Sequence, residues 1–343
     1  MSTLSEYTLD TTIKDADEQR GETMRAEATI RVLFMGTPDF AVPSLRALTE
    51  QANAGLAVAG VVTRPDKPVG RKRRMLFSPV KQFALEHDIP VYQPGPLRRP
   101  EALAQLREIA PDLIVVAAFG QILPPEVLSL PLHGCLNVHA SLLPRWRGAS
   151  PINTAILAGD SETGVTIMLM DAGLDTGPML ARRATPIGDS ETAGELSERL
   201  ALLGAELLVE TVPRWLAGAL MLEPQDDTQA TMTRLLRKSD GQLDWRLPAE
   251  ELARQVRAYT PWPGAFTTWQ GRTLKIQRAR AYSVTTDLPP GACFAPSGAG
   301  SLAVACGSGA LALEMIQLEG KRALPIADAV RGYPALASAH LGE

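Results

Sequence analysis

The segment C-L-N-V-H-A-S-L-L-P-R-W-R-G, residues 135–148, begins as a short apolar strand that carries two polar side chains. Side chains alternate between the two faces of a strand, so Asn137 and His139 point to the same face, about 7 Å apart at their α-carbons. Packing gives no reason for two polar groups on one face of a buried strand. The pattern therefore predicts a functional site at the end of this strand.

Short apolar runs alternate with helix-like patterns on both sides of this segment. The runs lie at 31–35, 56–62, 113–118, 136–140 and 165–170, and helical patterns lie between them at 43–51, 80–86, 101–109 and 151–158. This alternation predicts an α/β fold, a doubly wound, mostly parallel, Rossmann-like sheet. Ligands of such sheets bind beyond the carboxyl ends of the strands, where Asn137 and His139 are expected.

Composition divides the chain into four predicted segments. Residues 1–29 hold seven acids and three bases with few large apolar side chains, and we expect an acidic, disordered tail. Residues 30–220 form the predicted catalytic domain, which ends with a helix from Thr192 to about Thr211, capped by Thr192 and Glu195 and stopped before Pro213. A polar linker follows at 221–246.

The last predicted domain, residues 247–343, starts with a short helix at 249–258. Strand-like runs follow at 274–279, 292–294, 302–306 and 311–317, separated by glycine and proline. This spacing favours a small β-barrel of the oligonucleotide-binding (OB-like) kind.

Several classes of protein are disfavoured. The turn Gly36-Thr37-Pro38-Asp39 lacks the G-x-G-x-x-G pattern of dinucleotide binding. The three cysteines form no C-x-x-C pair and the four histidines lack metal-ligand spacing, so we predict no metal. Without a secretory signal or an apolar run long enough to cross a bilayer, we expect a cytoplasmic protein. Cys135 is expected to be a buried structural thiol, since nothing nearby would activate it.

A second polar element, M-D-A-G-L-D-T-G-P at 170–178, leaves the end of the next strand. There Asp175 can supply a carboxylate to His139. Asn, His and Asp without a Ser or Cys nucleophile indicate acyl-type transfer to an amine with no covalent enzyme intermediate. The amide and the imidazolium would stabilise the developing oxyanion by about 3–4 kcal/mol per donor, and the carboxylate would support the charged imidazole and relay protons through water.

A basic run lies at 64–74, with a single acid, Asp66, among its bases: Arg64, Lys67, Arg71, Lys72, Arg73 and Arg74. Its Pro and Gly predict a mobile loop projecting beside the active site. The acidic tail accounts for the chain's net charge of −4, so the remainder is neutral and the run stands out. We predict that it contacts phosphates of an RNA. Arg234, Arg237 and Lys238 in the linker are candidates for the same surface.

Eight co-ordered motifs resemble those of the 10-formyltetrahydrofolate-dependent formyltransferases, in particular those acting on methionyl-tRNA. The resemblance covers nearly everything after residue 29, and the acidic tail has no counterpart in it. The motifs are F-M-G-T-P-D-F-A-V-P-S-L at 34–45, T-R-P-D-K-P-V-G-R at 63–71, S-P-V-K at 78–81, A-F-G-Q-I-L-P at 118–124, N-V-H-A-S-L-L-P-R-W-R-G-A-S-P-I at 137–152, D-A-G-L-D-T-G-P at 171–178, D-G-Q-L-D-W at 240–245 and Y-T-P-W-P-G-A at 259–265.

The resemblance implies roles for particular residues. Asn137, His139 and Asp175 would be the catalytic trio, with 10-formyltetrahydrofolate as formyl donor and the initiator methionyl-tRNA as acceptor. Trp146 and Arg147 would contact the acceptor end or the methionyl group. We expect a monomer whose C-terminal domain helps to bind tRNA. The folate pocket would be lined by Phe119, Gly120, Gln121, Ile122, Leu123, Ser141, Leu142, Leu143 and Pro144.

Three alternatives remain open from the residues. The trio does not identify its acceptor, so a nucleotide sugar or a purine precursor could take the formyl group. A hydrolase would use water in place of the amine and lose formylfolate without an acceptor. A non-catalytic RNA-binding protein could have inherited the fold, although it would have no reason to keep all three polar residues.

Overall fold

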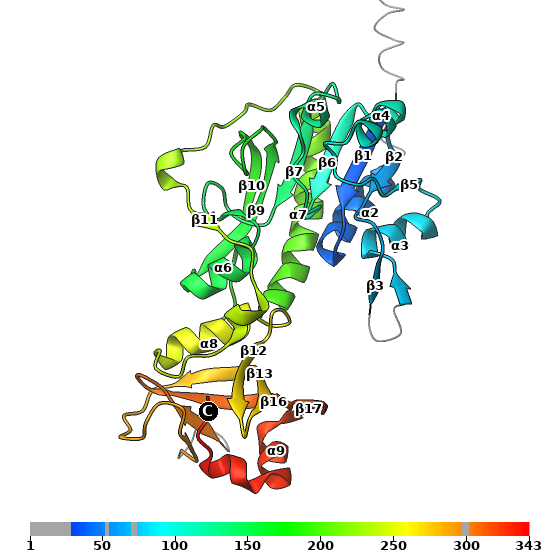
Figure 1. The fold of residues 1–343 in the computed structure, drawn as a ribbon. Helices are drawn as coiled ribbons and strands as arrows, with labels where there is room; N and C mark the ends of the chain where they lie inside the picture. The colour runs from blue at the N-terminus through cyan, green and yellow to red at the C-terminus, as the bar shows by residue number, and fades with distance from the viewer. Residues whose placement is uncertain (1–28, 52–54, 70–73, 297–301, 343) are drawn as a thin grey trace, which may run out of the picture. The chain divides into compact units, whose positions relative to one another are not determined.

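The computed structural model describes residues 29–51, 55–69, 74–296 and 302–342 (Figure 1). The acidic segment before Thr29 and the tip of the basic run, residues 70–73, lie outside them. The chain divides into two compact units between Leu136 and Asn137. This division falls within strand β7, Cys135–His139, of a sheet with the strand order β10-β9-β7-β6-β1-β2-β5.

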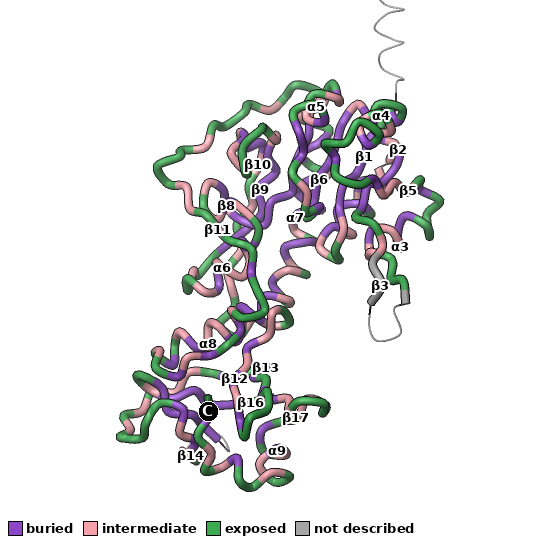
Figure 2. The backbone as a smooth tube through the Cα atoms, in the orientation of Figure 1, coloured by how far each residue is buried: buried purple, intermediate pink, exposed green. Residues whose placement is uncertain are grey.

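The first unit holds the parallel part of this sheet. Strand β1 pairs in parallel with β2 and β6, and β2 pairs in parallel with β5. Figure 2 shows β1 and β6 buried along most of their lengths, as the apolar runs at 32–35 and 113–117 require. The elements are β1 Ile30–Gly36, η1 Asp39–Ala41, α2 Val42–Glu50, β2 Leu56–Val62, β3 Lys67–Val69, β4 Arg74–Leu76, α3 Pro79–Glu86, β5 Val91–Tyr92, α4 Pro100–Ile109, β6 Leu113–Ala117 and α5 Pro125–Leu128.

The second unit continues from β7 and includes an antiparallel pair of strands. Strand β9 is followed by β10, which pairs with it in antiparallel register, so the sheet is mixed. The predicted α/β class is confirmed, although β10 itself was not foreseen. The elements up to the linker are β8 Arg147–Gly148, α6 Pro151–Ala158, β9 Glu162–Leu169, β10 Met179–Pro186 and α7 Ala193–Leu216.

Helix α7 begins as predicted and ends later than predicted. Thr192 accepts from the backbone N–H of Glu195, and the Glu195 carboxylate accepts in return from the backbone of Thr192. This is a complete capping box. The prediction of an end before Pro213 was wrong, because the helix continues to Leu216. A proline removes one hydrogen bond. The backbone N–H of Ala217 still bonds to the carbonyl of Pro213, which sustains one more turn.

The segment from 221 to 246 is tied to the catalytic part of the chain by two short ladders. The backbone groups of Glu223 and Met179 form two mutual hydrogen bonds, and β11 pairs in parallel with β8. The segment contains η3 Asp227–Gln229, β11 Met232–Thr233 and η4 Lys238–Gly241. Although its composition is that of a polar linker, it runs beside the strand-end turn that carries Trp146.

The C-terminal part is an antiparallel sheet over one hydrophobic core. Its strand order is β12-β13-β16-β15-β14, with β17 paired to β16, and its core includes Trp245, Leu252 and Ile316. The prediction of a separate small β-domain is confirmed, and its first helix has the predicted bounds. The elements are α8 Ala249–Ala258, β12 Ala265–Trp269, β13 Arg272–Tyr282, β14 Cys293–Phe294, β15 Ala303–Ala305, β16 Ala310–Leu318, β17 Ala323–Pro325, α9 Ile326–Gly332 and η5 Pro334–Ser338. Within the described ranges, no helix is long and apolar enough to span a membrane.

Candidate active site

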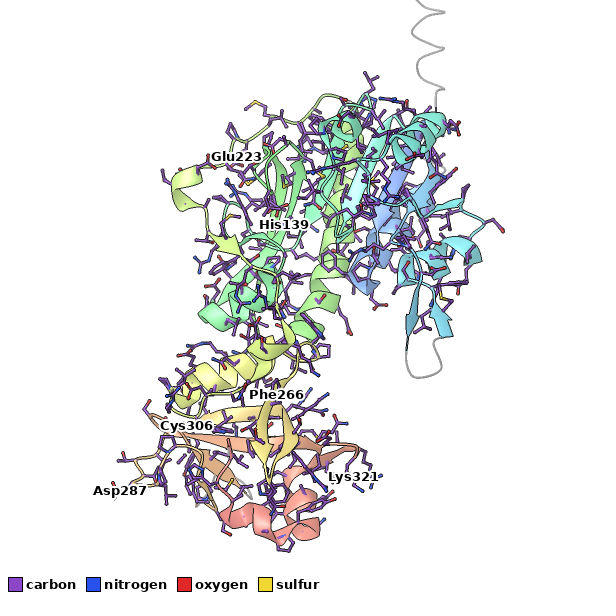
Figure 3. The ribbon with its side chains drawn as sticks, viewed as in Figure 1. His139, Glu223, Phe266, Asp287, Cys306 and Lys321 are labelled. Atoms are coloured by element: carbon purple, nitrogen blue, oxygen red, sulfur yellow. The ribbon has the colours of Figure 1, made fainter. Side chains whose placement is uncertain are left out.

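His139 lies at the end of β7 (Figure 3). Its imidazole lies between two oxygen acceptors. Its Nε2 is 3.0 Å from the carbonyl oxygen of Trp146, and its Nδ1 is 3.7 Å from Asp175 Oδ2. A carbonyl oxygen can only accept, so Nε2 carries a proton and donates it to this bond. Nδ1 is therefore the nitrogen that can exchange a proton, and it faces the carboxylate.

The carboxylate of Asp175 joins the other two predicted residues. Its Oδ2 accepts from the backbone N–H of Gly148 at 2.8 Å, and its Oδ1 accepts from Asn137 Nδ2 at 3.4 Å. Asp175 lies in the loop that follows β9 and adopts the left-handed region with φ 55°, which is uncommon outside glycine. The three side chains predicted from two separate motifs thus lie together within the second unit. Their catalytic roles remain a prediction.

Trp146 is held in a strained conformation next to this trio. Its φ of 62° is rare for a bulky residue and costs about 1–3 kcal/mol. Its backbone N–H donates to Thr231 Oγ1 at 2.8 Å and its indole N–H donates to Asp160 at 2.7 Å. The guanidinium of Arg145 covers the indole ring. These contacts fix the backbone carbonyl of Trp146, which accepts the hydrogen bond from His139 Nε2.

The side chain of Arg147 is engaged by the 221–246 segment. Its side chain is buried, its Nε donates to Gln225 Oε1 at 2.9 Å and a terminal nitrogen donates to Asp227 at 2.7 Å. Arg147 is therefore held by contacts with the 221–246 segment, and its expected contact with the acceptor end or the methionyl group stays a prediction. No local sequence pattern could predict Gln225 and Asp227 as partners of Arg147, because they lie 78 and 80 positions away in the sequence.

The residues assigned to the folate pocket fall in two places. In the second unit, Ser141 donates to the backbone oxygen of Arg145 and Leu143 packs on Met168 and Met179, so both side chains serve the fold. Leu142 lines a cavity of about 410 Å³ together with Trp146 and Asp160, whereas Pro144 is half-buried.

In the first unit, the predicted pocket residues alternate between buried and exposed positions. Phe119 and Leu123 are buried, whereas Ile122 is 68% exposed, which is unusual for so large an apolar side chain. Gly120 is exposed with φ 76°, and Gln121 is half-buried. The folate role of both groups remains a prediction.

The basic run is better ordered at its ends than predicted. Strands β3 and β4 form an antiparallel hairpin in which Lys67 pairs with Leu76, in place of the expected loop. Arg64 is exposed, Lys67 and Arg74 belong to the two strands, and Arg71, Lys72 and Arg73 lie outside the described residues.

Asp66, the one acid of the basic run, has its charge balanced from outside the run. Lys81 Nζ lies 2.5 Å from its carboxylate and Gln93 donates to it at 2.9 Å. The hydrogen bond from Lys81 lowers the pKa of Asp66 below its ordinary value. Asp66 is therefore not available to neutralise the neighbouring bases.

Neither thiol nor metal chemistry finds support in the described residues. Cys135 is buried, and burial raises the pKa of its thiol to about 12, so a thiolate is disfavoured at neutral pH. Burial also raises the pKa of Cys293 and of Cys306 to about 12. Among the described residues, no group of three or more His, Cys, Asp or Glu side chains could hold a metal ion.

Comparison with known families matches both parts of the chain. Residues 28–212 match the formyl transferase family and residues 235–334 match the formyl transferase C-terminal domain. Solved structures share the fold at 18% identity. HypX from Aquifex aeolicus has a TM-score of 0.60, covering 91% of this chain and 49% of that one. The N-formyltransferase of Helicobacter canadensis has a TM-score of 0.59, covering 83% and 99%. The two family matches define the class, a formyl transferase with the family's C-terminal domain.

Similar curated proteins identify the kind of formyl transferase to which the chain belongs. The methionyl-tRNA formyltransferase of Geobacter sulfurreducens is 49% identical over 316 residues, covering 92% of this chain and 98% of that protein. That of Stutzerimonas stutzeri is 51% identical over 299 residues, covering 87% and 93%. The chain belongs to the methionyl-tRNA formyltransferases, enzymes that transfer a formyl group from a folate donor to methionyl-tRNA.

Proposed function

We propose that the chain transfers the formyl group of 10-formyltetrahydrofolate to the free α-amino group of initiator methionyl-tRNA, through Asn137, His139 and Asp175. The observation that carries this proposal is the position of His139 Nδ1, which faces the Asp175 carboxylate at 3.7 Å beside the Asn137 amide. An acid, a base and an amide donor in one place suit direct attack of an amine on a carbonyl carbon.

The proposed reaction balances without a covalent enzyme intermediate. The amine nitrogen attacks the formyl carbon, and the formyl oxygen becomes anionic in a tetrahedral intermediate. Asn137 and the protonated Nδ1 of His139 donate hydrogen bonds to that oxygen, each worth about 3–4 kcal/mol. Asp175 takes the excess proton of the amine through water. The bond from the formyl carbon to N10 of the folate then breaks, and N10 takes up, through water, the proton that Asp175 received, which restores the carboxylate.

The tRNA contacts follow from charge. The 64–74 run contains one acid, which Lys81 already neutralises, so the run can engage phosphates. Arg234 is less available, because it pairs with Asp240 at 2.6 Å. We therefore assign the main phosphate contacts to the 64–74 run, with the C-terminal domain as a second contact. The enzyme would work as a cytoplasmic monomer.

A direct assay tests the proposal. Purified protein is incubated with 10-formyltetrahydrofolate and initiator tRNA charged with methionine, and blocking of the amino group is measured together with the release of tetrahydrofolate. The proposal predicts equal amounts of both products, and no release without charged tRNA. Steady loss of formylfolate in the absence of an acceptor would show hydrolysis instead. Formylation of an amino sugar but not of methionyl-tRNA would reassign the acceptor.

A further inference from the structure

The backbone of the loop that carries Asp175 is hydrogen-bonded by one side chain of the 221–246 segment, Gln225. Gln225 Nε2 donates to the carbonyl oxygen of Asp175 at 2.8 Å and to that of Gly177 at 2.7 Å. These two bonds use both hydrogens of the amide nitrogen. Because one of them binds the carbonyl oxygen of Asp175 itself, they restrain the backbone conformation that places the carboxylate beside His139.

The same amide also contacts the other half of the site. Gln225 Oε1 accepts from Nε of the buried Arg147 at 2.9 Å. Arg147 is flanked by Trp146, whose carbonyl binds His139, and by Gly148, whose N–H binds Asp175. Gln225 therefore joins the two turns on which the predicted catalytic groups depend.

The orientation of this amide is fixed by its neighbours. Arg147 can only donate and the two carbonyls can only accept, so a flipped amide would lose all three bonds. From residue 221 to 229, Gln225 is half-buried whereas its neighbours in the segment are exposed. A polar side chain whose two donors and whose oxygen are all engaged by two active-site turns is suited to positioning them.

We propose that Gln225 is a positioning residue for formyl transfer, holding Asp175 toward His139 and thereby making the 221–246 segment part of the active site. The inference rests on the proposed function of the trio. Gln225 acts through Asp175 rather than through substrate, so its effect should fall on the rate of the bound complex. A misplacement of about 1 Å at a reacting group costs up to about 100-fold in rate.

The test compares two neutral substitutions in one segment. Gln225→Met keeps the length of the side chain and removes both donors and the acceptor of the Arg147 bond, whereas the matched control Gln229→Met removes a single bond, from Gln229 to the exposed Asp226. We expect kcat to fall about 10- to 100-fold in Gln225→Met, with KM for tRNA and folate within about twofold. Gln229→Met should match the unsubstituted enzyme. Gln225→Glu, which keeps the acceptor for Arg147 but loses the donors, should resemble Gln225→Met.

Hydrogen exchange gives a readout independent of activity. Amides of residues 171–178 should exchange faster in Gln225→Met than in Gln229→Met, at equal melting temperatures. Unchanged kcat, unchanged exchange, or a loss of activity that only follows a loss of folded protein would each overturn the inference. An unsubstituted enzyme that fails to formylate methionyl-tRNA would instead overturn the proposed function, and the inference with it.

Discussion

At the scale of single residues, the site depends on which ring nitrogen of His139 is occupied by a hydrogen bond to the backbone. The bond from Nε2 to the Trp146 carbonyl leaves Nδ1 facing Asp175, so protons can be exchanged only on the side where the carboxylate lies. Asn137 donates one hydrogen of its amide nitrogen to the same carboxylate. The second hydrogen of that nitrogen can be donated to a substrate oxygen. The second amide hydrogen of Asn137 and Nδ1 of His139 can therefore both stabilise an oxyanion that forms and disappears in one turnover.

Replacing His139 with alanine should therefore lower kcat by about 100-fold or more, since an oxyanion donor and the proton carrier are both lost. Affinity for tRNA should change little, because phosphate contacts dominate it. Steady-state formylation and a tRNA binding assay measure the two effects. The control is Cys135→Ala, four residues earlier on the same strand, which should keep kcat. Equal losses in both variants would point to disruption of the strand and contradict the assigned role.

The trio was predictable from the sequence, but its supports were not. Asn137 and His139 lie two positions apart on a short apolar run, and Asp175 follows the next long run, so alternation and strand order bring them together. Gln225 and Thr231 lie far along the chain in a polar segment without periodicity. Hydrogen bonds that join residues about 50 to 85 positions apart leave no local pattern.

At the scale of elements, the turn that carries Trp146 and Gly148 depends on the segment that crosses it. Strand β11 pairs with β8, and the hydroxyl of Thr233 contacts the backbone at Arg147 and Ser150. Gly148, at φ 108°, leaves no room for a side chain, since an added Cβ would lie 2.7 Å from the Thr233 carbonyl oxygen. Close approach of the two backbones is therefore the reason for glycine at this position.

Gly148→Ala should separate this steric effect from that of backbone conformation when compared with Gly218→Ala. Gly218 also has a positive φ, 65°, but its added Cβ would meet nothing within 4 Å. We expect Gly218→Ala to cost about 1–2 kcal/mol of unfolding free energy. Gly148→Ala should cost a further 1–3 kcal/mol or so and also reduce kcat, because the N–H that binds Asp175 moves. Urea unfolding and kinetics of both variants provide the check, and equal costs would contradict the packing explanation.

Elements with strong local signals were predicted closely, and those set by tertiary context were not. The strand at 56–62 and the helices at 151–158 and 249–258 have the predicted bounds, because apolar spacing and nearby proline or glycine mark them. Strand β10 was missed because Arg182 and Arg183 interrupt its apolar residues. Helix α7 passes Pro213, and backbone bonds of the last turn form beyond the proline, among them that from Ala217 to the carbonyl of Pro213.

At the scale of the whole molecule, charge is distributed unevenly along the chain. Residues 1–29 carry a net charge of −4, equal to that of the full chain, so the remainder is neutral. Within that neutral remainder the 64–74 run concentrates six bases, and its only acid is bound by Lys81. A chain with acidic pI can therefore still present a local cationic surface to a nucleic acid.

Neutralising part of this run should weaken tRNA binding without impairing chemistry. We expect Arg71→Gln, Lys72→Gln and Arg73→Gln combined to raise the Kd for tRNA and to reduce the slope of log K against log salt by about 0.7–0.9 for each phosphate that the protein no longer neutralises. At saturating tRNA, kcat should stay within about twofold of the unsubstituted value. The control replaces three exposed bases outside the run, Arg98, Arg99 and Arg107, with glutamine. Both variants change the net charge equally, so equal salt slopes would show a general charge effect and remove the run from the binding surface.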